Sequence, residues 1–143
     1  MSLTQTATNS FKTGLMNGTF NFNTDTFKMA LYTGAATLDA ATSTYDSTNE
    51  ASGGNYLPGG QSLTVTVTPT TGSDPSSTVA YISFANVTWT GAITARGALI
   101  YKYNGTTNPS VCVLDFGSDK TSTTQFQVQF PAATNSSAII RIA

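Results

Sequence analysis

Apolar and polar side chains alternate with a period of two near the C-terminal end of the chain. Residues 125–130 read Gln-Phe-Gln-Val-Gln-Phe, and Pro131 follows them. Successive side chains of a β-strand point to opposite faces of its sheet, so this pattern places apolar residues on one face and glutamines on the other. Proline lacks the backbone donor that would continue the ladder. The segment predicts a strand with one buried face that ends before Pro131.

The same period recurs through most of the chain. Leu63, Val65 and Val67 alternate with serine or threonine, which predicts a strand with its apolar side inward and its threonines outward. Residues 27–32 also predict a strand with one buried face. Further predicted strands are bounded by Gly, Pro and Asn clusters that favour turns, and they cover 79–84, 86–89, 96–103, 111–116 and 139–142.

One short helix is predicted before the strands. Leu3, Ala7, Phe11 and Leu15 are spaced four residues apart, which would stack them on one side of a helix, and Asn17-Gly18 is a stop signal. With about eight short strands and little other helix, the fold class expected is all-β. We expect an antiparallel β-sandwich or a jelly-roll-like barrel, and the strand order stays open.

The composition supports an exposed sheet in one domain. The chain has 143 residues, of which 39% are hydrophobic and only 9% charged, whereas roughly 25% are charged in an average soluble protein. Threonine suits the solvent face of a strand, and it is a mediocre helix former. We therefore expect a single domain over 1–143, with an N-terminal arm and helix (about 1–18) and a long loop (about 34–60).

The charge and residue types exclude several functions. The net charge is −1 with no cluster of Lys or Arg, so we expect no nucleic-acid partner. Because the chain has no His and one Cys, it cannot form a Ser-His-Asp site, a Cys-His site or a zinc site. We expect no enzyme, no catalytic residues and no cofactor. The start lacks a secretory signal and no apolar run would span a bilayer, so we expect synthesis in the cytoplasm and no membrane contact.

Two segments are candidates for contact with a partner. The loop 34–60 contains Asn55, Tyr56 and Leu57 among glycines, and loops of this length are usually functional or mobile. A partner would order it on docking, or it would form a crossover packed on its own domain. The polar segment 1–8, with Leu3 and Thr4, would reach onto neighbouring subunits. On this view, deleting residues 1–8 leaves the fold intact and weakens assembly.

Other chemistry-bearing residues leave alternatives open. Calcium could be held by Asp39, Asp46 and Glu50, or by Asp115 with Asp119, although neither group has calcium-loop spacing. A carbohydrate-binding module would need a coplanar set of exposed aromatics beside a carboxylate, and the candidates for that set are Tyr45, Tyr56 and Tyr103.

Several single residues have structural interpretations. We expect Trp89 in the core and Cys112 as a small buried hydrophobe. Lys28, Arg96 and Lys102 stand singly on predicted strands, where charges commonly protect a sheet edge from unwanted pairing.

Several stretches together resemble a family of small structural proteins of tailed-bacteriophage particles. They are residues 10–12 and 25–33, the Asn49-Glu50 pair with its Gly-Gly-x-Tyr loop, and residues 95–101, 113–120 and 138–142. The resemblance covers nearly the whole chain and brings no catalytic residues. It implies a non-enzymatic role in the virion, without fixing the position.

Among particle roles, we favour a capsid cement or decoration protein. Such proteins are commonly small β-sandwiches or jelly rolls that sit as oligomers between capsomers, which is an analogy of fold. A cement role implies that the partners are the major capsid protein or other virion proteins. It also implies a homo-oligomer, with a trimer favoured. A tail, baseplate or fibre component is the first alternative, followed by the carbohydrate-binding module.

Overall fold

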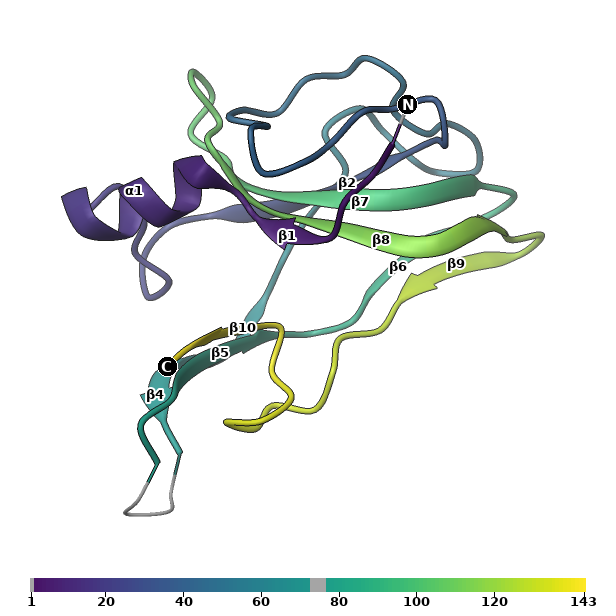
Figure 1. Ribbon diagram of the computed structural model, residues 1–143. Helices are drawn as coiled ribbons and strands as arrows, with labels where there is room; N and C mark the ends of the chain where they lie inside the picture. The colour runs from purple at the N-terminus through teal and green to yellow at the C-terminus, as the bar shows by residue number, and fades with distance from the viewer. Residues whose placement is uncertain (1, 73–76) are drawn as a thin grey trace.

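The computed structural model describes residues 2–72 and 77–143. In these residues, ten strands and one helix form a β-sandwich (Figure 1). The main sheet has five strands in the order β1-β8-β7-β2-β3, and all its pairs are antiparallel. Its strands are β1 (Thr6–Ala7), β2 (Phe27–Tyr32), β3 (Gln61–Ser62), β7 (Thr94–Lys102) and β8 (Ser110–Thr121). The predicted all-β fold is confirmed.

The second layer consists of two small sheets under opposite ends of the main sheet (Figure 1). One has the order β10-β5-β4 and the other pairs β6 with β9. Their strands are β4 (Val65–Thr71), β5 (Ala80–Phe84), β6 (Val87–Thr90), β9 (Gln125–Val128) and β10 (Ile140–Ile142). The predicted strands are present, and β1 and β3 are additional short ones.

Helix α1 (Asn9–Asn17) begins later than the four-residue spacing predicts. Its N-cap is Thr8, whose hydroxyl oxygen accepts a hydrogen bond from the Phe11 N–H. Leu3 and Ala7 are therefore not on the helix, and Ala7 lies in β1, paired with β8. The predicted stop is confirmed, because Gly18 ends the helix in the left-handed conformation at φ +79°.

Replacing Thr8 by Ala should lower the free energy of unfolding by about 2 kcal/mol, the upper part of the range for a lost N-cap. Thr8 is fully buried, and its hydroxyl also contacts the carbonyls of Ser110 and Val111 and the Ser110 hydroxyl. Urea denaturation measures the loss. Thr13→Ala is the control, because the exposed Thr13 hydroxyl bonds only within the helix. Equal effects of the two substitutions would contradict the role of Thr8.

The main sheet is buried on both faces. Toward the second layer, Phe27, Met29 and Ile100 join a core that includes Trp89 and Phe84. On the outer face, a second cluster consists of Ala30, Tyr32, Ala36, Leu38, Leu99, Tyr101 and Val113. The prediction of one buried face for residues 27–32 is thus wrong, since the long loop covers the other face. Trp89 and Cys112 are buried as predicted, and burial raises the pKa of the Cys112 thiol to about 12.

Lys28 and Lys102 do not protect a sheet edge. Lys28 lies on β2 and Arg96 and Lys102 on β7, and both strands have a neighbour on each side. These side chains have local partners instead: the Tyr103 ring for Lys28, Asp115 for Arg96, and Asp25 for Lys102. The edge interpretation is therefore wrong for Lys28 and Lys102, whereas Arg96 lies just before the part of β7 that pairs with β2.

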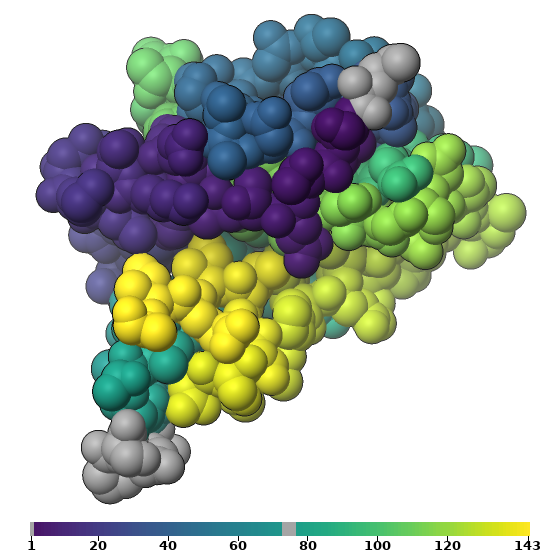
Figure 2. Space-filling view, viewed as in Figure 1, coloured from purple at the N-terminus to yellow at the C-terminus, as the bar shows by residue number. Residues whose placement is uncertain are grey.

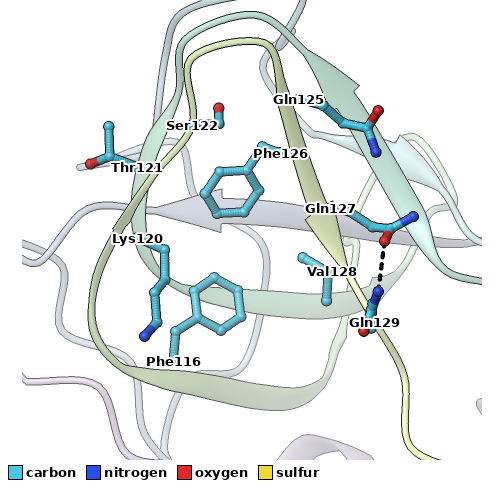
Figure 3. A pocket seen from close by; sticks show the side chains of 9 residues that line it. All are labelled: Phe116, Lys120, Thr121, Ser122, Gln125, Phe126, Gln127, Val128 and Gln129. Atoms are coloured by element: carbon cyan, nitrogen blue, oxygen red, sulfur yellow. Dashed lines mark hydrogen bonds between the residues drawn. The ribbon is translucent and has the colours of Figure 1, made fainter.

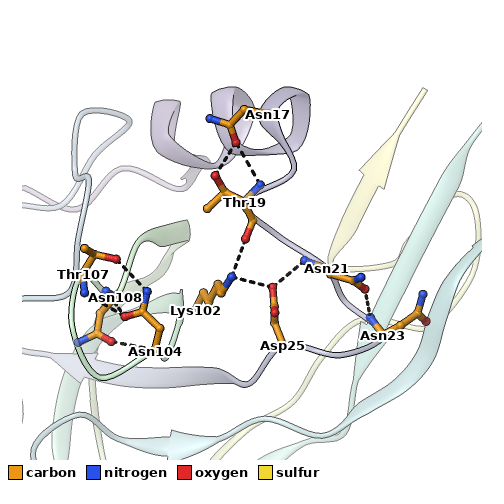
Figure 4. A network of polar contacts seen from close by, with 9 residues as sticks. All are labelled: Asn17, Thr19, Asn21, Asn23, Asp25, Lys102, Asn104, Thr107 and Asn108. Carbon is orange, nitrogen blue, oxygen red and sulfur yellow. Dashed lines mark hydrogen bonds and ion pairs between the residues drawn. The ribbon is translucent and has the colours of Figure 1, made fainter.

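Lys102 fixes the segment that follows α1 to the main sheet (Figure 4). Its Nζ donates to the Thr19 carbonyl at 2.6 Å and lies 3.1 Å from the Asp25 carboxylate. The same carboxylate accepts the Asn21 N–H at 2.7 Å. Since Thr19 follows directly on the helix cap, this network holds the C-terminal end of α1 in place.

Candidate protein-binding surface

The loop 34–60 packs on its own domain along the part of the β2 edge that β3 leaves unpaired. Beyond the two residues of β2 that β3 pairs, the Leu31 N–H donates to the Tyr56 hydroxyl at 2.9 Å. The Leu31 carbonyl accepts the Ala51 N–H at 2.8 Å, and the Thr33 N–H donates to the Asn49 carbonyl at 3.0 Å. The structure therefore has the crossover arrangement, in which the loop closes this edge of the sheet.

Glu50 holds the loop together. Its carboxylate accepts hydrogen bonds from the Tyr45 hydroxyl at 2.8 Å, the Tyr56 hydroxyl at 2.5 Å and the Gly59 N–H at 2.7 Å. The Tyr101 hydroxyl donates to the Gly59 carbonyl at 2.7 Å. Desolvation by burial, followed by the hydrogen bond to Glu50, raises the pKa of Tyr56. The carboxylate therefore anchors the loop through three donors.

The three loop residues that were predicted to contact a partner differ in their exposure to solvent. Tyr56 is buried, and its ring lies 5.7 Å from that of Trp89. Asn55 is exposed, and its side chain accepts the Thr90 N–H at 2.9 Å. Leu57 is 71% exposed, so among the three it presents the largest apolar surface to solvent.

The N-terminal arm is also part of the fold. Leu3 forms a parallel bridge with Leu38 and packs on the outer cluster, and the Thr4 N–H donates to the Leu38 carbonyl at 2.9 Å. Residues 6–7 pair with β8. The expectation of a free arm is wrong for residues 2–8, and removing them would delete the helix cap. Met1 lies outside the described residues.

A groove opens where the two terminal segments of the chain meet. This groove of about 810 Å³ lies between α1 and β1 on one side and β10 on the other, where the N- and C-terminal segments run side by side (Figure 2). Its apolar lining includes Phe11, Leu15, Met16, Leu114, Ile140 and Ile142. Met16 is 82% exposed and Ile142 50%. Exposed apolar surface of this kind marks protein–protein contacts.

No protein-family model, characterised protein or solved structure matches this chain.

A smaller pocket of about 440 Å³ lies farther along β8 (Figure 3). Phe116 and Phe126 form its apolar wall, with ring centroids 6.2 Å apart, while Gln127 and Gln129 stand at its rim and hydrogen-bond each other at 2.8 Å. The pocket occupies the opening between β8 and β9, which diverge into different sheets. It is a second opening of the sandwich and shares no lining residue with the groove.

The aromatic residues considered for sugar stacking do not form one exposed platform. Tyr45 stacks on Tyr101 at 4.8 Å, Tyr56 is buried, and Tyr103 faces Lys28.

The acidic residues considered for calcium make local contacts. The carboxylates of Asp39 and Asp46 each accept a backbone N–H two residues ahead, and Asp115 pairs with Arg96. Within residues 2–72 and 77–143, no group of three or more Cys, His, Asp or Glu could hold a metal ion. No helix in the described parts of the chain is long and apolar enough to cross a membrane.

Sequence reasoning missed the groove. Leu15 and Met16 are adjacent apolar residues on a nine-residue helix, so only one of the two can follow the buried side. This apolar pair was the one sequence feature of the helix that indicated an exposed apolar surface. The contribution of Ile142 could not be found without the position of β10.

Proposed function

We propose that this chain is a non-enzymatic structural protein of a tailed-bacteriophage particle, and that it acts there as a capsid cement protein. The observation that carries the proposal is the groove beside α1 and β10, where exposed apolar side chains gather. Surfaces of this kind serve protein partners. The particle itself is inferred from the resemblance of the sequence stretches described above.

The organisation of the domain suits a cement role. The loop and the arm are bound to the sheet through backbone hydrogen bonds. The domain would therefore dock with little ordering of its backbone, and docking that requires less ordering costs less free energy. A lattice of symmetric contacts then multiplies weak interfaces, so a modest groove is sufficient. The major capsid protein is the proposed partner on the shell.

Imaging of reconstituted shells tests this proposal. Purified protein is mixed with phage heads that lack it, and the particles are examined by cryo-electron microscopy. We expect ordered, symmetric density at capsomer junctions, with the side that bears α1 and β10 toward a neighbouring protein. Bare shells at saturating protein would contradict the cement role. Density on the tail of intact particles would replace it with the tail, baseplate or fibre role.

Met16→Asp gives this experiment a matched variant. Met16 is almost fully exposed, so the substitution should leave the fold intact while placing a charge at the groove. We expect the occupancy on shells to fall. Lys120→Glu changes the charge of a side chain outside the groove and should leave the occupancy unchanged. Unchanged occupancy of the Met16 variant would exclude the groove from the contacts that hold the protein on the shell.

A further inference from the structure

The groove concentrates the exposed apolar side chains of the molecule. Residues 2–72 and 77–143 leave five large hydrophobic side chains exposed, and Leu15, Met16 and Ile142 of these line the groove. Leu57 is a fourth, and it lies on the outer loop, residues 34–60. The molecule therefore has an apolar recess and, on another surface, an apolar protrusion.

The groove also collects positive charge. The side chains of Lys12 and Arg141 line it, no Asp or Glu of the described residues does, and the last residue of this chain, Ala143, adds its terminal carboxylate to the lining. Neither Lys12 nor Arg141 has an ion-pair partner among those residues, whereas Arg96 and Lys102 each pair with an aspartate. The groove consequently has two cationic side chains against one terminal carboxylate, so it is apolar with a net positive charge and fits an occupant with the opposite charge.

The outer loop carries the complementary charge. No Lys or Arg occurs between Lys28 and Arg96, and the loop 34–60 contains Asp39, Asp46 and Glu50. The Asp46 side chain is exposed, and hydrogen bonds from Thr48 lower the pKa of its carboxyl. It is therefore charged at neutral pH.

The chain neighbours of Asp46 and Leu57 are held by one side chain. The Glu50 carboxylate binds both Tyr45, which precedes Asp46, and Gly59, which follows Leu57 by two residues. The backbone near the charged Asp46 and near the exposed Leu57 is thus fixed by the same carboxylate. Because the loop is held by hydrogen bonds, it would present both groups without first becoming ordered.

We propose that the groove binds the outer loop of a second copy of this chain, with Leu57 on the apolar lining and Asp46 facing Lys12 and Arg141. Opposite charges with matching apolar surfaces give such a contact its specificity. A contact between two different surfaces closes into a ring or continues as a filament, depending on its rotation. The inference does not rest on a particle role, since it concerns the purified chain alone.

Sedimentation velocity of the purified protein, with charge-reversed variants, tests the proposal. We expect the wild type to self-associate at low ionic strength, and more weakly as salt screens the charges. The groove variant Lys12→Glu/Arg141→Glu should raise the dissociation constant about tenfold or more, as charge reversal replaces attraction by repulsion. The loop variant Asp46→Lys should also weaken association. An equimolar mixture of the two variants should associate again, because the reversed charges match.

Two further variants keep the test independent of folding defects. Met16→Asp changes an 82% exposed side chain and should weaken association without altering the circular dichroism spectrum. Lys120→Glu reverses a cation outside the groove and should leave association unchanged. A wild type that stays monomeric at low salt would overturn the proposal. So would association that the groove variants do not weaken, or a mixture of variants that fails to associate. None of these results depends on shell binding.

Discussion

Gly60→Ala should lower the free energy of unfolding by about 4 kcal/mol, well beyond the range of ordinary single substitutions. Gly60 has φ +77°, and a Cβ on it would lie 1.7 Å from the Met29 carbonyl oxygen. That atom belongs to the backbone of β2, a strand paired on both sides, so it cannot move independently. The substitution would force the end of the loop away from the main sheet. Urea denaturation of the purified protein measures the loss.

Gly105→Ala is the matched control for this substitution. Gly105 has nearly the same conformation, at φ +75°, but a Cβ on it would meet nothing within 4 Å. It therefore isolates the conformational cost of a side chain at positive φ, about 1 kcal/mol. The difference between the two variants measures the close approach of the loop to β2. Equal losses would show that Gly60 does not lie against the strand.

Glu50→Ala should cost about 3 kcal/mol, because the removal of a charged acceptor leaves its buried donors unpaired. The Tyr45 hydroxyl, the Tyr56 hydroxyl and the Gly59 N–H all lose their acceptor. The buried Tyr56 hydroxyl is the most affected, since it also accepts the Leu31 N–H. Chemical denaturation gives the free energy, and the near-ultraviolet circular dichroism reports the tyrosine environment.

Glu50→Gln separates the shape of the side chain from its accepting capacity. Glutamine keeps one acceptor oxygen, but it presents an amide group to the second tyrosine, so the loss should be intermediate. Asp46→Asn is the control at an exposed carboxylate of the same loop and should change stability by less than about 0.5 kcal/mol. A Glu50→Ala variant as stable as the Asp46 variant would contradict the anchoring role.

The strands were predictable because the alternation of apolar and polar residues that produces them lies within each segment. The alternation in 125–130 determines which side chains face inward, and Phe126 and Val128 are buried while Gln125 and Gln127 are exposed. The threonine-rich segment was less well predicted. Val65 and Val67 are only half-buried, because β4 is the edge strand of a small sheet.

The long loop and the arm were not predictable by the same reasoning. Their order comes from partners far along the chain, such as Tyr56 bonded to Leu31 and Thr8 to Val111. Polar composition and glycine content suggest mobility, yet the part of the β2 edge that β3 leaves unpaired supplies backbone groups that pair with the loop. In the same way, Leu3 fits the four-residue spacing of a helix, but in the structure it lies before α1 and forms a bridge with Leu38. The groove depends on four separate elements, α1, β1, β8 and β10, and has no local pattern.

Hydrogen exchange at the Ala51 amide tests most directly whether the loop 34–60 is a permanent layer of the fold. This N–H donates to the Leu31 carbonyl at 2.8 Å across the edge of β2. We predict that Ala51 exchanges only with global unfolding, as slowly as the Leu99 amide in the centre of β7. Exchange of Ala51 at the rate of an unprotected amide, while Leu99 stays protected, would show that the loop opens independently and that the edge of the sheet is free.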